Sequence, residues 1–300
     1  MAAVLERRQV VVRPTGAALA ADIEGIDLAG ALTPEAVAAI KAAWADHLVL
    51  RFRGQRLSDE DLLRFSRHLG ELDWAPIAAA RTRAPGADRE IEVTPEGHQY
   101  VLIISNVIED GVAIGQLGAY EALWHTDMSY IPEPPSASAL YSLEVPPAGG
   151  DTGFCNMYRT YETLAPELRR QIAGQLCRHD ASRNSAGELR RGFVDAPDPS
   201  QTIGAEHPLV RTHPVTGRKA LFLGRRRNAY IADLPLADSE ALLDALWAHA
   251  TKSEFAWYQQ WLVGDLILWD NRCVMHRRDA FDPATRRVMH RTQIKGDRPF

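Results

Sequence analysis

The sequence predicts an all-β core with flanking helices, built as a single domain over residues 1–300. Three observations predict this fold class. The apolar runs are short and strand-like, few of them alternate with helices as β-α-β units, and the helical patterns are concentrated early in the chain. No internal repeat or low-complexity tract divides the 300 residues. We therefore expect one antiparallel core.

Helical patterns begin at recognisable capping residues. Thr33 precedes Pro34 and an apolar stripe at helical spacing, which predicts a helix start. Ser58 and Asp61 have the spacing of a capping box, and Gly70 is expected to end that helix. Later helices are expected to start at Asn156, in the first turn at Pro166, and at Asp238 or Ser239.

Strand patterns are short apolar runs bounded by turn residues. Between them lie two long irregular stretches, 76–97 and 180–206, and the first is rich in proline, glycine and charge. Both are expected to be surface loops and are candidate lids over a site. The strand patterns occupy residues 47–52, 101–105, 138–145, 266–269 and 288–294.

The charge of the chain argues against nucleic acid as a partner. The 34 Lys and Arg residues are outnumbered by 39 Asp and Glu, for a formal net charge of -5, and they form no basic stripe. No run of eighteen apolar residues occurs, and the first residues contain no apolar signal segment. We expect a cytoplasmic protein without a membrane partner.

Cysteine usage agrees with a reducing compartment. Cys155, Cys177 and Cys273 are odd in number, widely spaced and in no Cys-x-x-Cys pair. This pattern indicates neither a disulfide framework nor a zinc finger. We assign these thiols no chemistry.

One histidine has an aspartate two residues later, in His125-Thr126-Asp127. If this segment is a strand, positions i and i+2 point to the same face, so the imidazole and the carboxylate converge as two ligands of a metal. The pair alone is a weak signal and needs a third ligand. The candidates are His207, His213, His249, His276 and His290.

His276 is the distinctive candidate because it follows the strand 266–269 and a turn-like Asp270-Asn271-Arg272. Two histidines and one carboxylate leave three positions open on an octahedral Fe(II), although zinc would accept the same ligands. Asp270 and Asn271 are candidates for orienting the segment that carries His276.

A nearby binding site for a dicarboxylate would distinguish an Fe(II) oxygenase site from a zinc site. Arg287 and Arg291 differ by four and share a face if residues 286–291 form a strand. An arginine fork suits bidentate capture of a carboxylate, and Thr152 offers a hydroxyl to the same anchor. The alternative for these arginines is a solvated basic face.

At this point the sequence resembles the taurine and phenoxyacetate-herbicide dioxygenases, which depend on Fe(II) and 2-oxoglutarate. The resemblance covers nearly the whole chain, and the motifs match in order and spacing. They are Gly25-Ile26-Asp27-Leu28, Trp124-His125-Thr126-Asp127, Gly149-Gly150-Asp151-Thr152, His207-Pro208-Leu209-Val210-Arg211, Trp269-Asp270-Asn271-Arg272 and Gly296-Asp297.

The resemblance implies a double-stranded β-helix, the jelly-roll or cupin-like fold, with iron inside the barrel mouth. His125, Asp127 and His276 fall on the family's iron ligands, and Thr152 and Arg287 fall on its anchor for 2-oxoglutarate. The implied reaction consumes O2 and 2-oxoglutarate, hydroxylates a C–H bond and releases succinate and CO2. Asp127 itself argues for hydroxylation, since halogenating relatives lack this carboxylate.

The same resemblance bears on the substrate. Arg291 falls on an arginine that faces the anionic group of the substrate, and Trp74 and Tyr120 are further candidate contacts. Ala75 and Glu121 depart from the residues of the taurine enzyme. We expect a small carboxylate or sulfonate other than taurine, with an apolar body. A homo-oligomer is also expected.

Two other functions remain open. A non-catalytic jelly-roll module that binds a metal or an anion would have the same fold, but it has no reason to keep Thr152 and Arg287 beside three ligands. A zinc hydrolase would need a carboxylate general base, and only Glu121 is near in sequence.

Overall fold

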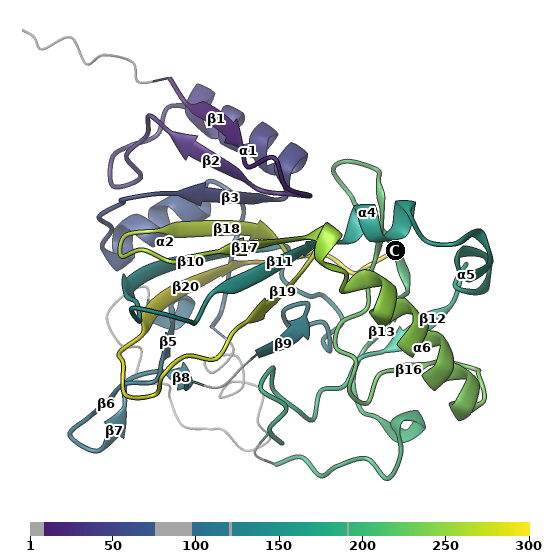
Figure 1. The fold of residues 1–300 in the computed structure, drawn as a ribbon. Coiled ribbons are helices and arrows are strands. Elements are labelled where there is room, and N and C mark those ends of the chain that lie inside the picture. The colour runs from purple at the N-terminus through teal and green to yellow at the C-terminus, as the bar shows by residue number, and fades with distance from the viewer. Residues whose placement is uncertain (1–8, 76–97, 120–121, 191) are drawn as a thin grey trace, which may run out of the picture.

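The computed structural model describes residues 9–75, 98–119, 122–190 and 192–300, and two facing β-sheets form its centre (Figure 1). The expected loop 76–97 lies outside the described residues. The stretch 180–206 is irregular for most of its length, as expected. Among the described residues, no helix is long and apolar enough to cross a membrane.

The larger sheet is mostly antiparallel. Its strands are β1 (Val11–Pro14), β2 (Ala21–Glu24), β3 (Val49–Phe52), β4 (Leu72–Asp73), β5 (Leu102–Ser105), β8 (Gln116–Leu117), β10 (Ala137–Glu144), β18 (Leu266–Asp270) and β20 (Val288–Ile294). Their order is β1-β2-β3-β18-β10-β20-β5-β8, with β4 paired to β20. Only β2 with β3 and β5 with β8 run parallel among these described pairs. The strands predicted for this sheet are confirmed to within two residues at each end.

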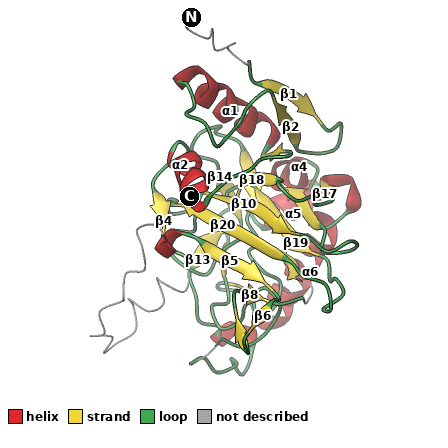
Figure 2. Ribbon diagram, turned by 90° about the vertical axis from the view of Figure 1, so that its left-hand side faces the viewer, coloured by secondary structure: helices red, strands yellow, loops and turns green. Residues whose placement is uncertain are grey.

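The smaller sheet is antiparallel throughout. It consists of β9 (Ala122–His125), β11 (Thr152–Asn156), β17 (Ala256–Gln259) and β19 (Val274–Arg278), in the order β17-β11-β19-β9. Trp269 of β18 lies 5.6 Å from Phe154 and 4.8 Å from His276, measured between ring centroids. The two sheets therefore pack face to face, and Figure 2 shows β10, β18 and β20 side by side in the larger one.

Three small sheets lie outside this core. A hairpin joins β6 (Ile108–Glu109) to β7 (Val112–Ala113). A three-stranded sheet contains β12 (Leu176–Arg178), β13 (Glu206–Pro208) and β16 (Tyr230–Ile231), and β14 (Val210–Thr212) pairs with β15 (Lys219–Leu221).

The helices flank the sheets, as predicted. They are α1 (Pro34–His47), α2 (Asp59–Arg67), α4 (Met157–Glu162), α5 (Pro166–Gln171) and α6 (Leu236–Ala250), with 3-10 turns η1 (His98–Tyr100), η2 (Pro199–Gln201) and η3 (Ser253–Phe255). In Figure 1, α1 and α2 lie beside β1–β3, while α4, α5 and α6 gather at the other end of the molecule. The capping predictions at Thr33, Ser58 and Asn156 are confirmed by their side-chain hydrogen bonds.

The predicted start of the last helix is wrong. Helix α6 begins at Leu236, ahead of both Asp238 and Ser239, and Pro235 is its N-cap. The hydroxyl of Ser239 caps nothing and instead accepts a hydrogen bond of 2.9 Å from the backbone N–H of Ile231 in β16. Proline fixes a backbone φ that leads into a helix without a side-chain cap.

Two apolar clusters hold these layers together. One lies under α1 and α2 against the larger sheet, with Ile40, Phe65 and Leu268 among its buried members. The other includes Phe154 and Trp269, lies between the two sheets and continues to α4 and α6. The interface between the sheets is therefore rigid, and the polar residues described next are set into it.

Candidate metal centre

The two candidate imidazoles are direct neighbours across two strands. His125 on β9 is the register partner of His276 on β19, and their ring centroids are 4.2 Å apart. The Nδ1 of His125 lies 2.7 Å from the backbone carbonyl oxygen of Leu123. A carbonyl only accepts, so Nδ1–H donates to it and the lone pair of Nε2 is left free.

Asp127 also lies beside the two imidazoles, but a turn places it there and not the predicted strand. Strand β9 ends at His125, and Asp127 lies in the following turn, where Met128 has a φ of 48°. The prediction that one strand face aligns the pair is therefore wrong. The turn brings Asp127 Oδ1 to 3.7 Å from His125 Nε2 and 3.9 Å from His276 Nε2.

The other oxygen of Asp127 is held by the larger sheet. Ser138 Oγ of β10 donates to Oδ2 at 3.0 Å, and Gln293 Nε2 of β20 donates at 3.3 Å. Arg291 Nη1 lies 3.2 Å from Oδ1 and 3.1 Å from Oδ2. The small sheet thus supplies the two imidazoles, and the large sheet orients the carboxylate toward them.

Electrostatics favour the ionised aspartate and the neutral histidine. Burial alone would raise the pKa of Asp127, but the charge of Arg291, together with His276 and His125, outweighs burial and holds the pKa well below its usual value. Burial, with neighbouring His125, holds the pKa of His276 well below the usual value. A carboxylate and neutral imidazoles are the forms that bind metals.

This donor set fits one metal ion. The donor atoms of His125, Asp127 and His276 all lie within 4.8 Å of one another. Asp127 Oδ1 lies 3.7 and 3.9 Å from the two Nε2 atoms, and two bonds of about 2.1 Å to one ion can span these distances. Two imidazoles and one carboxylate form the facial set that suits Fe(II) in oxygenases. Of the five histidines considered from sequence, His276 is the one that the fold brings to the pair.

The side chain of Asn271 orients Asp127, whereas the sequence predicts that it orients the segment that carries His276. Its Oδ1 accepts a hydrogen bond of 2.9 Å from the backbone N–H of Asp127, and its Nδ2 donates to the Asp127 carbonyl oxygen at 3.0 Å. Nδ2 also donates to the carbonyl oxygen of Pro135 at 2.8 Å. One buried amide therefore fixes the backbone on both sides of the Asp127 side chain.

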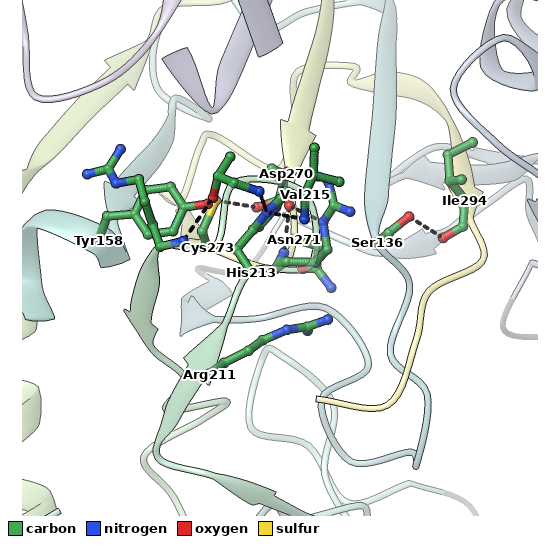
Figure 3. Close-up of polar contacts among 12 residues, drawn as sticks. Ser136, Tyr158, Arg211, His213, Val215, Asp270, Asn271, Cys273 and Ile294 are labelled. Carbon is green, nitrogen blue, oxygen red and sulfur yellow. Dashed lines mark hydrogen bonds and ion pairs between the residues drawn. The ribbon is translucent and has the colours of Figure 1, made fainter. Parts of the chain in front are cut away.

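A second group of possible ligands, His213, Asp270 and Cys273, lies next to this asparagine (Figure 3). The Nδ1 of His213 accepts from two backbone N–H groups, those of Val215 and Thr216, at 3.2 and 3.1 Å. Its Nε2 therefore carries the proton and donates to Asp270 Oδ2 at 3.0 Å.

The carboxylate oxygens of Asp270 and the thiol of Cys273 are also unavailable to a metal. Arg272 donates to both oxygens of Asp270, from Nε at 2.8 Å and from Nη2 at 2.7 Å. Burial, reinforced by the charge of Asp270, holds the pKa of the Cys273 thiol well above its usual value. The group is a hydrogen-bonded brace for the turn that carries Asn271, with no donor set for a metal.

Arg287 and Thr152 also come from opposite sheets. Arg287 directly precedes β20, and Thr152 begins β11. The Trp261 indole Nε1–H donates to Thr152 Oγ1 at 2.9 Å, and the Arg287 guanidinium carbon lies 6.0 Å from the centroid of the same indole ring. Because the hydroxyl accepts from tryptophan, its own proton is free to donate elsewhere.

Arg287 is a buried cation that forms no ion pair with a carboxylate among the described residues. It is 2% exposed, and its Nε has no hydrogen-bond partner in the same part of the chain. Burial, together with the charge of the nearby Arg278, lowers the pKa of Arg287 to about 9. A bound carboxylate would compensate this desolvated charge. The predicted alternative of a solvated basic face is wrong for Arg287 and Arg291, which are both buried.

The structure describes two of the three predicted substrate contacts, Arg291 and Trp74. Arg291 is buried and directed at Asp127, as described above. Trp74 follows β4 and is 37% exposed, while Tyr120 lies outside the described residues. Sequence reasoning missed Ser138, Gln293 and Trp261, whose roles depend on pairing between distant strands that no local motif signals.

The family is settled by comparison with known proteins. The family model described as taurine catabolism dioxygenase TauD, TfdA family matches residues 12–293. The chain belongs to this family. Within it, the chain resembles an alpha-ketoglutarate-dependent 2,4-dichlorophenoxyacetate dioxygenase of Cupriavidus pinatubonensis, 34% identical over 96% of this chain and 98% of that protein. Alpha-ketoglutarate is 2-oxoglutarate under another name.

Other relatives carry different names. A pentalenolactone F synthase of Streptomyces arenae is 34% identical over 95% of this chain and 94% of its own length. An alpha-ketoglutarate-dependent sulfate ester dioxygenase of Pseudomonas putida is 31% identical over 96% of this chain and 90% of its own length. These names confirm the prediction of a 2-oxoglutarate-dependent dioxygenase over that of a non-catalytic module.

Solved structures agree with the family. A taurine dioxygenase from Burkholderia xenovorans superposes with a TM-score of 0.75 at 32% identity, covering 97% of this chain and 92% of that one. AAD-2, solved with Mn(II) and N-oxalylglycine, also gives 0.75 at 28% identity, covering 97% and 99%. The prediction of a β-rich core with few helices is confirmed.

Proposed function

We propose that this protein is an Fe(II)- and 2-oxoglutarate-dependent dioxygenase that hydroxylates a C–H bond of a small anionic substrate. One observation carries the proposal: a His-Asp-His donor set lies in the same sheet interface as a buried arginine without a carboxylate partner among the described residues. A dioxygenase that uses a dicarboxylate needs both features, whereas a metal-binding module needs only the first.

The metal would be held by His125, Asp127 and His276. When bound, Fe(II) together with 2-oxoglutarate supplies the oxidising power for C–H hydroxylation. The protein's own contribution is positional. The Leu123 carbonyl keeps His125 Nε2 deprotonated, and Ser138 keeps Asp127 turned toward the imidazoles.

The far carboxylate of 2-oxoglutarate would bind Arg287 and the free proton of Thr152. N-oxalylglycine in the AAD-2 structure is a dicarboxylate of the same length, which supports a site for such a dicarboxylate in this protein. Arg287 contributes charge and Thr152 contributes direction, because Trp261 fixes the hydroxyl by donating to it. The indole also covers this anchor and limits its contact with water.

For the substrate, we propose a class of compound. The relatives' names include a chlorinated phenoxyacetate and a sulfate ester, which supports a small organic anion. Arg291, Trp74 and Tyr120 stay predictions as substrate contacts.

We also propose that the two facing sheets form a double-stranded β-helix within a single domain, in a cytoplasmic enzyme. The homo-oligomeric state stays a prediction.

The test is succinate release from 2-oxoglutarate in air, with and without Fe(II), across a panel of phenoxyacetates and alkyl sulfates. Wild-type protein is expected to release succinate only with Fe(II), and fastest with its preferred anion. Asp127→Ala removes a donor and is expected to lose at least about 100-fold in rate. Equal rates in wild type and Asp127→Ala, or no release across the panel, would contradict the proposal.

A further inference from the structure

Two arginines outside the predicted site share one aromatic ring. The guanidinium carbon of Arg190 lies 4.0 Å from the centroid of the Tyr130 ring, and that of Arg225 lies 5.6 Å from the same centroid. Tyr130 belongs to the turn that begins at Asp127. The pair of cations therefore stands beside the proposed metal ligands, although the arginines are distant from them in sequence.

Neither arginine has an anionic partner in the part of the chain that the structure describes. No carboxylate forms an ion pair with either side chain there, whereas nearby Arg183 pairs with Asp195 and Arg226 pairs with Glu240. Arg225 Nη1 donates to the Arg183 carbonyl oxygen at 2.6 Å, and its Nε is buried with no partner. Two like charges are thus held beside one ring with no ion pair to either of them among the described residues.

The backbone fixes Arg225 beside the metal centre. The N–H of Thr126, between His125 and Asp127, donates to the carbonyl oxygen of Gly224 at 3.0 Å. Gly224 has a φ of 64°, and a Cβ there would lie 2.0 Å from the ring of His179. Only glycine lets the loop approach this closely, so the next side chain, Arg225, starts at a defined point.

Electrostatics agree with an anion site. Burial, together with the charge of Arg190, lowers the pKa of Arg225 to about 10. Asp127 and Asp180 act in the opposite direction from a distance, but Asp127 is already bound to Arg291. Asp180 accepts from Ser182 N–H and from Asn228. A guanidinium pair of this kind gains more from an oxyanion than a solvated pair does.

We propose that Arg225 and Arg190, stacked on Tyr130, bind the oxyanion of the substrate. This inference rests on the proposed function. It gives the substrate a carboxylate or a sulfate group on the side of Arg225, in addition to the predicted contact with Arg291. Guanidinium groups can bind either oxyanion, because both carry a negative charge on two or three terminal acceptor oxygens.

The test follows anion binding to the anaerobic complex of protein, Fe(II) and 2-oxoglutarate, by the change in its visible absorption band. The probes are 2,4-dichlorophenoxyacetate, hexyl sulfate and the uncharged 2,4-dichlorophenoxyacetamide. At least one anion is expected to bind, and the amide at least tenfold more weakly than its acid. Comparison of the acid with the sulfate decides which oxyanion is preferred.

Arg225→Gln and Arg190→Gln are each expected to raise the dissociation constant of the bound anion about tenfold or more, with 2-oxoglutarate affinity unchanged within about twofold. Arg227→Gln, at an exposed position of the same loop, is the matched control and is expected to bind like wild type. If Arg225→Gln does not fold, Arg190→Gln decides, because within the described residues its side chain makes no hydrogen bond.

Three results would overturn the inference. One is an absorption band that forms normally and that no probe anion changes, which leaves the proposed function intact. Another is equal affinity for the anion in wild type and in both variants, which returns the anchor to Arg291. The third is a selective loss of 2-oxoglutarate in the variants. Absence of the band in wild type would instead count against the proposed function itself.

Discussion

At the scale of single residues, the proposed cosubstrate site depends on the direction of one hydroxyl. Thr152 Oγ1 accepts from the Trp261 indole, which leaves its own proton to donate to a carboxylate. The neighbouring Arg287 supplies charge without a comparable constraint on direction. Loss of the hydroxyl should therefore weaken 2-oxoglutarate without affecting the metal ligands.

Thr152→Val is expected to raise the dissociation constant of 2-oxoglutarate about tenfold, since a hydrogen bond to a carboxylate contributes about 1.5 kcal/mol. It should also lower the free energy of unfolding by about 1 kcal/mol, because Trp261 loses its acceptor. Thr152→Ser keeps the hydroxyl and serves as the control. Anaerobic titration and urea unfolding measure both effects, and wild-type affinity in Thr152→Val would refute the hydrogen bond.

At the scale of elements, the turn between β18 and β19 couples the two sheets to the metal centre. The side chain of Asn271 in this turn makes three hydrogen bonds, two of them to the backbone of Asp127. Asp270 braces the same turn through His213 and Arg272. The position of one proposed ligand thus depends on a segment more than one hundred residues later in the chain.

Asn271→Ala is expected to weaken Fe(II) binding about 10- to 100-fold, as losses of groups that orient metal ligands do. Asn156→Ala is the matched control, because Asn156 is also buried and also makes three hydrogen bonds to backbone, but at the start of α4. Both variants should lose stability, and only the first should lose metal affinity, measured by competition with a chelator. Equal metal affinities would show that Asn271 is purely structural.

Elements were predictable from sequence where the signal was local. Caps at Thr33 and Ser58 and the apolar run of β20 were recognisable because each depends on residues a few positions apart. The turn at Asp127 was not, because its shape depends on Asn271 and on Gly224, which are far away in the chain. The donor set could be proposed from sequence, but the route by which the fold assembles it could not.

At the scale of the whole molecule, the buried ion pair of Asp270 and Arg272 links stability to pH. Burial opposes ionisation of Asp270, but Arg272 and His213 outweigh it and hold the pKa of Asp270 well below its unfolded value of about 3.9. A depressed pKa contributes stability above the unfolded value, and this contribution is lost as pH falls toward the folded value.

Asp270→Asn is therefore expected to lower the free energy of unfolding at pH 7 by about 3 kcal/mol, because it leaves Arg272 buried without its charge partner. The difference from wild type should narrow as pH falls below about 4. Urea unfolding of metal-free protein between pH 7 and pH 3 measures it. A difference that stays constant with pH would show that the charge of Asp270 is not what stabilises the turn.

The central claim is that one interface between two sheets holds both a metal and a dicarboxylate. Anaerobic titration of metal-free protein with Fe(II) and 2-oxoglutarate, in wild type and in Arg287→Gln, tests it most directly. Wild type should develop the weak visible absorption band of the iron chelate, and Arg287→Gln should need about 10- to 100-fold more 2-oxoglutarate. Wild type that binds Fe(II) but develops no band would contradict the claim.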